Sequence, residues 1–291
     1  LEYGKRTPES TIMDPGSFGL PGVAHRWRDW KPGGHGAVNL HKSIVISCDT
    51  YYYGVGNDLG IDNIHAFFSK FGFGERTGID IDGERTGTLP SQEWKMKRYR
   101  QKWFAGDTIS VSIGQGYLIA TPMQLAFATA VLANNGVAYK PHLVRHVIET
   151  KTGVLRPIEP QPIRNLNLNP RWVDFVKNAM VDVTKSGTAF LAAKGAPYNF
   201  GGKTGTAQVV AMKQGEKYDE KKVAERLRDH ALFVAFAPAE SPRIALAVLV
   251  ENGGHGGSTA APIARTVFDY YLLGKVPANM PELNPDADEP D

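Results

Sequence analysis

The segment Phe200–Val210 constrains the fold more than any other stretch, because it combines a strand pattern with a cluster of polar side chains. The segment contains a run of β-branched residues in an alternating pattern, which begins with Lys203, Thr204, Gly205 and Thr206. This pattern predicts a strand with the lysine and glycine on one face and the two threonines on the other. The glycine leaves the backbone open to close approach. A cation, two hydroxyls and an open edge suit an extended ligand that ends in a carboxylate and adds as a strand.

Two similar patterns have to be separated from this strand. A Gly-Lys-Thr string at 202–204 resembles the end of a phosphate-binding loop, but the glycine required five positions earlier is Pro197. The spacing therefore excludes a nucleotide site of that kind. A second Lys-Ser-Gly-Thr, at Lys185–Thr188, follows an apolar-periodic helix over Trp172–Val183. That copy indicates a helix end with Gly187 as its cap, so the strand copy is the candidate functional one.

Composition narrows the classes of partner. The chain has 291 residues, of which 42% are hydrophobic, and its net charge of +3 does not favour nucleic acid as a partner. The run Trp94–Lys102 mixes aromatic residues with cations, and we interpret it as a solvated face with packed aromatics. The sequence contains no stretch of about 18 apolar residues, so no membrane span is predicted. No signal peptide is visible. The single cysteine excludes an internal disulfide.

The order of the predicted elements gives the fold class. Residues 1–38, rich in glycine and proline, predict a long ordered loop. Strands with short connections in the second half imply an antiparallel sheet with helices on its faces, an α/β (α+β) fold. We expect a domain over 1–274, with a charged excursion at Lys213–Arg228, and a disordered, acidic, proline-rich tail over 275–291. The expected helices are Asn39–Tyr53, Ile61–Phe71, Gly106–Tyr117, Thr121–Asn135, Arg171–Thr184 and Ser258–Leu272; a peripheral hairpin spans Val137–Ile158, and two apolar strands span His230–Ala237 and Arg243–Glu251.

Five short motifs occur along the chain: Ser47-Cys48-Asp49 in a predicted helix, Lys203-Thr204-Gly205-Thr206, Gly106–Gly116, Arg226–His230 and Glu251–Gly254. Each motif is weak alone, but their order is specific. Together they resemble the penicillin-recognising serine transferases, and within them the class B penicillin-binding proteins of the rod-shape elongation machinery. The likeness covers residues 1–274 and implies the D,D-transpeptidase and β-lactamase-like fold.

The first motif of this family, Ser-x-x-Lys, supplies the nucleophile and its lysine base. No serine in this sequence has a lysine three positions later. In the family the motif lies just upstream of a loop like residues 1–38. The chain is thus expected to be the C-terminal part of a catalytic domain, without the nucleophile helix and the two strands that precede it. Such a part leaves a sheet edge and a core face open.

The resemblance implies serine acyl transfer between peptidoglycan stem peptides, inhibited by β-lactams and without a catalytic cofactor. Ser47 would relay a proton to the leaving amine, and Lys203 would keep that network cationic. Thr204 and Thr206 would bind the terminal carboxylate beside Gly205, and the N–H of Thr206 would form half of the oxyanion hole. From the residues alone, Ser47 bonding a carbonyl of its own helix and Lys203 lying on the surface remain open alternatives.

The resemblance also implies a place and partners in the cell. We expect the periplasmic face of the bacterial inner membrane, reached through an N-terminal anchor outside this sequence. Expected partners are an elongation-type glycosyltransferase and a periplasmic scaffold protein, with no nucleic acid. The rival functions are a D,D-carboxypeptidase or β-lactamase and a catalytically inactive module that binds wall peptides or penicillin. No Glu-x-x-x-Asn element for deacylation is evident, which disfavours fast hydrolysis.

Asp49 stands where the wider family has asparagine. A carboxylate accepts hydrogen bonds but donates none, so Asp49 is expected to orient lysines and not the substrate amide. Elongation-type members resemble this sequence in having aspartate.

Cys48 suggests a structural zinc site. Asp14, Asp29 and His35 all lie in loop sequence that must fold over the helix bearing this thiol. A thiolate, an imidazole and two carboxylates can make a four-coordinate zinc centre. The alternative is a buried neutral thiol. His41 is less suited, because seven residues of helix place it about 10 Å along the axis from Cys48.

Overall fold

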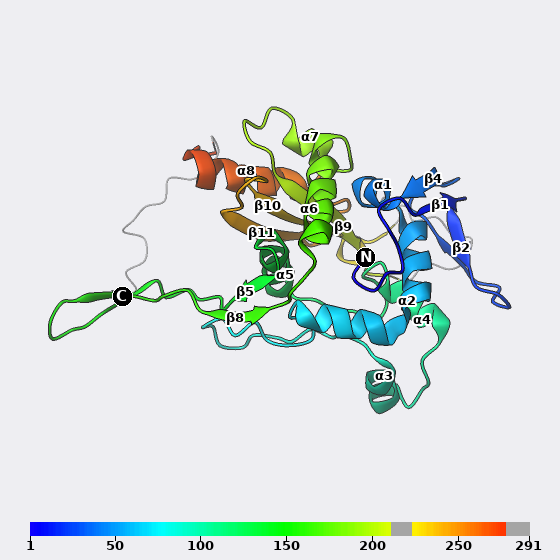
Figure 1. Ribbon diagram of the computed structural model, residues 1–291, viewed down its shortest axis with the longest axis horizontal. Helices are drawn as coiled ribbons and strands as arrows, with labels where there is room; N and C mark the ends of the chain where they lie inside the picture. The colour runs from blue at the N-terminus through cyan, green and yellow to red at the C-terminus, as the bar shows by residue number, and fades with distance from the viewer. Residues whose placement is uncertain (211–222, 278–291) are drawn as a thin grey trace.

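A three-stranded antiparallel sheet is the centre of the computed structural model, which describes residues 1–210 and 223–277 (Figure 1). The strands are β9 (Gly201–Ala207), β10 (His230–Ala237) and β11 (Ile244–Val250), in the order β11-β10-β9. Lys203 lies opposite Val234, and Thr206 lies opposite Ala231. The strand predicted around Lys203 and the two apolar strands after it are therefore confirmed.

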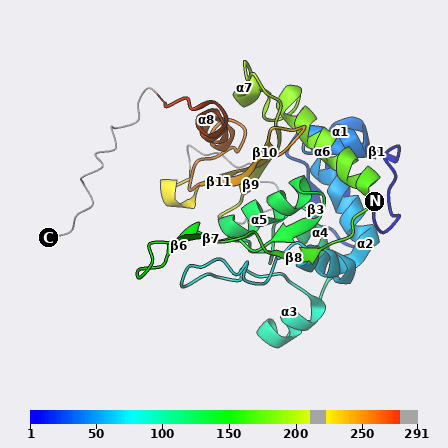
Figure 2. The same cartoon turned by 60° about the vertical axis from the view of Figure 1, so that its left-hand side comes forward.

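Helices cover both faces of this sheet, with α8 (Ala260–Leu273) above it and α5 (Pro122–Ala133) below it in both views (Figures 1 and 2). The helix α6 (Pro170–Lys185) packs along β9. The apolar faces of these helices enclose a core with four fully buried rings. These are Phe200 just before β9, Phe233 and Phe236 on β10, and Phe268 on α8. Burial of such rings is the main stabilising term of a core like this. The α/β (α+β) fold class is confirmed.

The N-terminal helical region departs from the prediction. The single helix expected over Asn39–Tyr53 is wrong, because two helices, α1 (Leu40–Val45) and α2 (Asp49–Lys70), meet at a sharp turn. Ser47, in that turn, has a left-handed φ of 58°. Asn39 does cap α1, since its side chain accepts a hydrogen bond from Lys42 N. The loop before α1 forms two small antiparallel pairs, β1 (Thr11–Asp14) with β4 (Gly36–Asn39) and β2 (Ser17–Gly19) with β3 (Arg26–Arg28).

The remaining elements lie at the periphery. The predicted hairpin is confirmed as β6 (His146–Ile148) paired with β7 (Leu155–Pro157), and its base is β5 (Val137–Tyr139) paired with β8 (Pro162–Asn165). The helix α4 (Ala105–Val111) is shorter than predicted, because Gly114 and Gly116 adopt left-handed backbone after it. Three further elements were not predicted: α3 (Gln92–Tyr99), α7 (Phe190–Ala193) and the short 3₁₀ helix Glu225–Leu227.

Two expectations fall mostly outside the described residues. Most of the charged excursion lies within 211–222, and most of the tail lies within 278–291. Among the described helices, none has both the length and the apolar character needed to cross a membrane.

Candidate functional site

The site is built around a contact between two segments that are far apart in the chain. Lys203 Nζ donates a hydrogen bond to Ser47 Oγ at 2.7 Å and another to the carbonyl oxygen of Thr204 at 3.0 Å. Lys203 comes from the sheet strand β9, whereas Ser47 comes from the turn between α1 and α2. The two predicted catalytic residues therefore lie together. The placement of Ser47-Cys48-Asp49 within one helix is wrong, because Cys48 is the N-cap of α2 and Asp49 its first residue.

Asp49 lies close enough to influence Lys203. Burial raises the pKa of Asp49 to about 7, and the nearby Asp29 carboxylate adds to this rise. Its Oδ2 accepts a hydrogen bond from Trp30 N at 3.0 Å, which favours the charged form. Burial lowers the pKa of Lys203 to about 8, although the negative charge of Asp49 opposes that shift. A lysine and a carboxyl with these values can hold and move protons near neutral pH.

The polar end of β9 lies at the edge of the sheet. Within the described residues no further strand pairs with β9 on its outer side, where an extended ligand could add. The segment at Gly256 packs closely against this strand, since a Cβ on Gly256 would lie 2.6 Å from the carbonyl oxygen of Gly205. Thr206 is fixed from outside the strand, because its carbonyl oxygen accepts a bond from Gln115 Nε2 at 2.8 Å. The binding of a carboxylate at this edge of β9 stays a prediction.

Thr188 is a site residue that the sequence argument missed. Its Oγ1 lies 2.7 Å from Thr204 Oγ1, so the two hydroxyls share a hydrogen bond. Thr188 belongs to the second Lys-Ser-Gly-Thr copy, which does end a helix as predicted, although the C-cap of α6 is Ser186 and not Gly187. The glycine has a different role: a Cβ on Gly187 would lie 2.3 Å from the carbonyl oxygen of Val45. Because Gly187 has no Cβ, the turn after α6 can pass against the end of α1. This path brings Thr188 to the strand β9.

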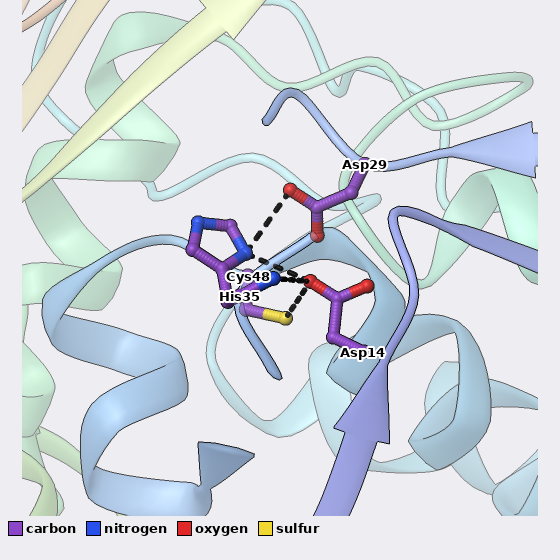
Figure 3. Close-up of side chains that lie close together, drawn as sticks. All are labelled: Asp14, Asp29, His35 and Cys48. Atoms are coloured by element: carbon purple, nitrogen blue, oxygen red, sulfur yellow. Dashed lines mark hydrogen bonds and ion pairs between the residues drawn. The ribbon is translucent and has the colours of Figure 1, made fainter. Parts of the chain in front are cut away.

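The four residues predicted as metal ligands also converge (Figure 3). One ligand atom from each of Asp14, Asp29, His35 and Cys48 lies within 4.8 Å of all the others. His35 Nδ1 is 2.8 Å from Asp14 Oδ2 and 3.4 Å from Asp29 Oδ1, and Cys48 Sγ is 3.4 Å from Asp14 Oδ2. Metal–ligand bonds of about 2.0–2.3 Å set tetrahedral ligands roughly 3.3–3.8 Å apart. Some ligand atoms of this cluster are closer than that and others are farther apart, so small shifts of these atoms would let them hold one zinc ion.

Without a cation, the surroundings of this cluster favour a neutral Cys48 thiol beside charged Asp14. Burial raises the pKa of the Cys48 thiol well above its usual value, and the carboxylates of Asp29 and Asp14 raise it further. Burial alone would also raise the pKa of Asp14, but hydrogen bonds, first from the N–H of Gly16 and also from His35, lower it to about 2. Zn²⁺ would reverse the preference of the thiol by stabilising its thiolate. His41, the weaker candidate, lies outside the cluster and pairs with Asp182 at 2.9 Å.

Trp30 joins this cluster to the Ser47 turn. It directly follows Asp29, its backbone N–H donates to Asp49 Oδ2, and its indole Nε1 donates to the carbonyl oxygen of Ile46 at 3.1 Å. Asp29 itself accepts a hydrogen bond from Thr50 N at 3.1 Å. The sequence argument missed Trp30, because a loop tryptophan carries no signal of such contacts. The metal-type cluster and the Lys203–Ser47 pair thus share one short backbone segment.

An apolar cavity of about 600 Å³ opens beside Lys203. It lies between α2, α5, α6 and the sheet, and Leu1 stands on its wall. The lining is almost entirely hydrocarbon and aromatic, as shown by Ile44, Phe68, Leu132, Val176, Met180 and Val234. An open apolar space of this size inside a domain is unfavourable unless another segment fills it.

Comparison with known proteins gives one consistent result. Residues 1–269 match the family described as penicillin binding protein transpeptidase domain. The chain is 49% identical over 275 residues to the peptidoglycan D,D-transpeptidase MrdA of Acinetobacter baumannii, which covers 94% of the chain but only 40% of that protein. The chain thus spans less than half the length of this curated relative.

Solved structures agree with this match. The crystal structure of Pseudomonas aeruginosa PBP2 in complex with WCK 5153 has a TM-score of 0.81 and 42% identity over 97% of this chain and 58% of that one. A complex between PBP2 and MreC from Helicobacter pylori gives a TM-score of 0.76 and 33% identity, and covers 93% of this chain and 47% of that one.

Proposed function

The chain belongs to the penicillin-binding protein transpeptidase family, and from this premise we propose that it is the C-terminal part of a peptidoglycan D,D-transpeptidase of cell-wall elongation. The observation that carries the proposal is the 2.7 Å bond between Lys203 Nζ and Ser47 Oγ, next to the open edge at Thr204–Thr206. This pairing brings a cation and a hydroxyl to the edge strand that is proposed to bind the carboxylate of the donor peptide. β-Lactams would act as covalent inhibitors of the complete enzyme.

The nucleophile of the complete enzyme is proposed to lie upstream of Leu1, in a Ser-x-x-Lys helix. The apolar cavity of about 600 Å³ supports this placement, because Leu1 lines it and Lys203 stands in its wall. An amphipathic helix seated there would bury its apolar face among Phe68, Leu132 and Met180. Its serine would then face the Lys203–Ser47 pair. The same helix would complete the core that the described residues leave open.

The chemistry follows as two acyl transfers. The upstream serine attacks the carbonyl carbon between the two terminal D-alanines, and the C–N bond breaks to give an ester and free D-alanine. The lysine of the Ser-x-x-Lys motif takes the proton of that serine and returns it to Ser47, which passes its own proton to the leaving amine. Cationic Lys203 stabilises the negative charge that develops. An amine of a neighbouring stem peptide then attacks the ester, forms the cross-linking amide and returns the proton to the serine. The threonines hold the terminal carboxylate of the donor in the first step, and the N–H of Thr206 supplies half of the oxyanion hole.

Labelling with a fluorescent penicillin, followed by intact mass, tests this function. The chain extended upstream to include a Ser-x-x-Lys helix is expected to gain one adduct, whereas the present chain gains none. Lys203→Ala in the extended form should slow labelling, while Lys185→Ala, in the second Lys-Ser-Gly-Thr copy, should not. A folded extended form that never labels would support the inactive binding module instead. An adduct that forms and is rapidly hydrolysed would support a carboxypeptidase or β-lactamase.

We also propose that Asp14, Asp29, His35 and Cys48 bind a structural zinc ion. The convergence of four ligand atoms within 4.8 Å and the burial of both carboxylates and the thiol support it. The ion would tie the loop over residues 1–38 to the helix that begins at Asp49. Elemental analysis of protein purified without added metal should find about one equivalent of zinc, lost in Cys48→Ser and retained in His41→Ala. Less than a tenth of an equivalent in the unsubstituted protein would overturn the proposal.

The cellular setting is proposed from the relatives. The Helicobacter pylori PBP2 structure contains MreC, which supports a periplasmic scaffold protein as a partner of this chain too. An elongation-type glycosyltransferase would supply the glycan strands that a transpeptidase cross-links. Both partners fit a protein held at the periplasmic face of the inner membrane by an anchor outside residues 1–291. Co-purification of the full-length protein with each partner, compared with residues 1–291 alone, tests this assignment.

A further inference from the structure

We propose that the basic and aromatic protrusion formed by residues 94–104, together with Tyr117, binds the glycan strand of the peptidoglycan substrate. The proposal rests on the transpeptidase function above and adds a second contact surface to it. The protrusion is the part of the chain that the sequence argument interpreted as an ordinary solvated face. In Figures 1 and 2 its helix α3 stands away from the sheet and the other helices.

The protrusion is held rigid by a small core of its own. Lys95 is only 2% exposed, and its Nζ is paired with Asp107 at the start of α4. The same Nζ lies 4.8 Å from the ring centroid of Phe104 and 5.2 Å from that of Tyr117. A buried lysine with a carboxylate and aromatic faces around it fixes the two segments against each other. The surface outside this core is therefore a formed platform and not a frayed helix end.

The outer surface of the protrusion combines flat rings with cations. Tyr99 is 48% exposed and Phe104 is 51% exposed, although both are large apolar rings. Arg98, Arg100 and Lys102 are exposed in the same segment, and Lys102 Nζ lies 5.5 Å from the ring centroid of Phe104. Arg100 has a left-handed φ of 57° at the C-cap of α3, so the helix ends there and the chain turns back toward Phe104. Exposed rings held in fixed positions beside cations are typical of a binding surface.

A short series of contacts links this surface to the proposed substrate edge of β9. The rings of Tyr99 and Tyr117 lie 5.5 Å apart, and Tyr117 is two residues beyond Gln115. Gln115 donates the hydrogen bond to the carbonyl oxygen of Thr206 on β9. A polymer whose stem peptide lies along β9 would thus pass close to the protrusion. This link favours the substrate polymer over an unrelated partner.

The chemistry of peptidoglycan suits both features of the surface. The apolar faces of its sugar rings can lie flat against Tyr99 and Phe104, and the free carboxylates of its stem peptides can meet Arg98, Arg100 and Lys102. Exposed ion pairs of this kind are individually weak and screened by salt, so several have to act together. An anionic membrane is the other macromolecular surface that cations and rings could contact, and the experiment below separates the two.

The test is co-sedimentation of the full-length protein with purified peptidoglycan sacculi at low ionic strength. The triple variant Arg98→Ala, Arg100→Ala, Lys102→Ala should bind about tenfold more weakly than the unsubstituted protein. Tyr99→Ala should also weaken binding, and raised salt should reduce the difference made by the charges. A matched control removes three exposed cations elsewhere, through Lys140→Ala, Arg145→Ala and Lys151→Ala in the β5–β8 region, and should bind normally.

Two results would overturn the inference. One is a triple variant that sediments with sacculi as well as the unsubstituted protein does. The other is binding to vesicles of anionic phosphatidylglycerol that the triple substitution abolishes while sacculus binding stays unchanged. Penicillin labelling of the same proteins keeps this test apart from that of the proposed function. The triple variant should label at the normal rate, because the substitutions lie outside the acylation site, whereas failure of every protein to label would count against the transpeptidase assignment alone.

Discussion

The left-handed backbone at Ser47 predicts which of two substitutions, Ser47→Gly or Ser47→Ala, leaves the protein more stable. Ser47 has a φ of 58°, a conformation that costs an L residue about 1–2 kcal/mol and glycine almost nothing. Ser47→Gly and Ser47→Ala both remove the hydroxyl that accepts from Lys203, so that loss cancels when the two variants are compared. Glycine lowers the free energy of unfolding by about 0.4–1 kcal/mol relative to alanine, because it gives the unfolded chain more conformational freedom. The glycine variant should therefore be the more stable by about 1 kcal/mol.

Unfolding in urea and thermal unfolding both measure this difference. For a domain of this size the glycine variant should unfold about 2 °C above the alanine variant. Ser43 provides the control, because it lies inside helix α1 with ordinary helical backbone. At that position alanine should be the more stable by roughly 0.8–1 kcal/mol. The order of the two residues should thus reverse between Ser43 and Ser47.

An alanine variant at Ser47 that equals or exceeds the glycine variant in stability would refute the reasoning. It would mean that the turn relaxes without cost, and that no strain is held at this position. Both variants should also label slowly with penicillin in the upstream-extended protein, since neither can relay a proton. Greater stability together with lost activity in the glycine variant would show strain retained for function.

Three further predictions concern the same site. The rate of penicillin acylation should fall as the pH rises through about 8, because Lys203 loses its charge there; a rate that is flat up to pH about 10 would contradict this role. Trp30→Phe removes the indole donor to Ile46, a bond of about 1 kcal/mol, and should slow acylation about fivefold, measured with unchanged far-ultraviolet circular dichroism. Gly256→Ala places a Cβ 2.1 Å from the carbonyl oxygen of Leu232 and should destabilise the domain by about 2–3 kcal/mol in urea unfolding.

The sheet could be predicted because its signals are local. β-Branched and apolar alternation over His230–Ala237 gave the bounds of β10, and the alternation around Lys203 gave the correct strand. The helix α6 was also predicted to within one residue at each end, because its apolar residues recur at helical spacing. In each case the pattern within a single segment is sufficient to specify the element.

The break at Ser47 could not be predicted in this way. No glycine, proline or asparagine marks residues 46–48, so the sequence continues a helical pattern through them. The left-handed serine is held by groups from elsewhere, through the bond from Lys203 to its Oγ and the bond from Trp30 to Ile46. Tertiary contacts here override local preference, which is common at functional sites.

The helix α3 and the role of Thr188 were missed for a related reason. The run Trp94–Lys102 lacks apolar periodicity, and its helix depends on the cap at Ser91 and on burial of Lys95 against rings that come later in the chain. Thr188 reaches Thr204 only because Gly187 lets the turn after α6 pass beside α1. The spacing of residues along the sequence indicates neither of these contacts, so neither could be predicted from it.

The segment Ile46–Thr50 explains why the metal-type cluster and the catalytic pair should act together. Within it, Ser47 offers its hydroxyl to Lys203, and Cys48 offers its thiol to the carboxylate cluster. Thr50 N donates to Asp29, and the neighbouring Trp30 donates to Ile46 O and Asp49 Oδ2 of the same segment. A cation that fixed Cys48 would therefore limit the rotation of the backbone on either side of it, including the left-handed residue that precedes it. On this argument zinc would take no part in the acyl transfer, and would act by keeping the Ser47 hydroxyl within hydrogen-bond distance of Lys203.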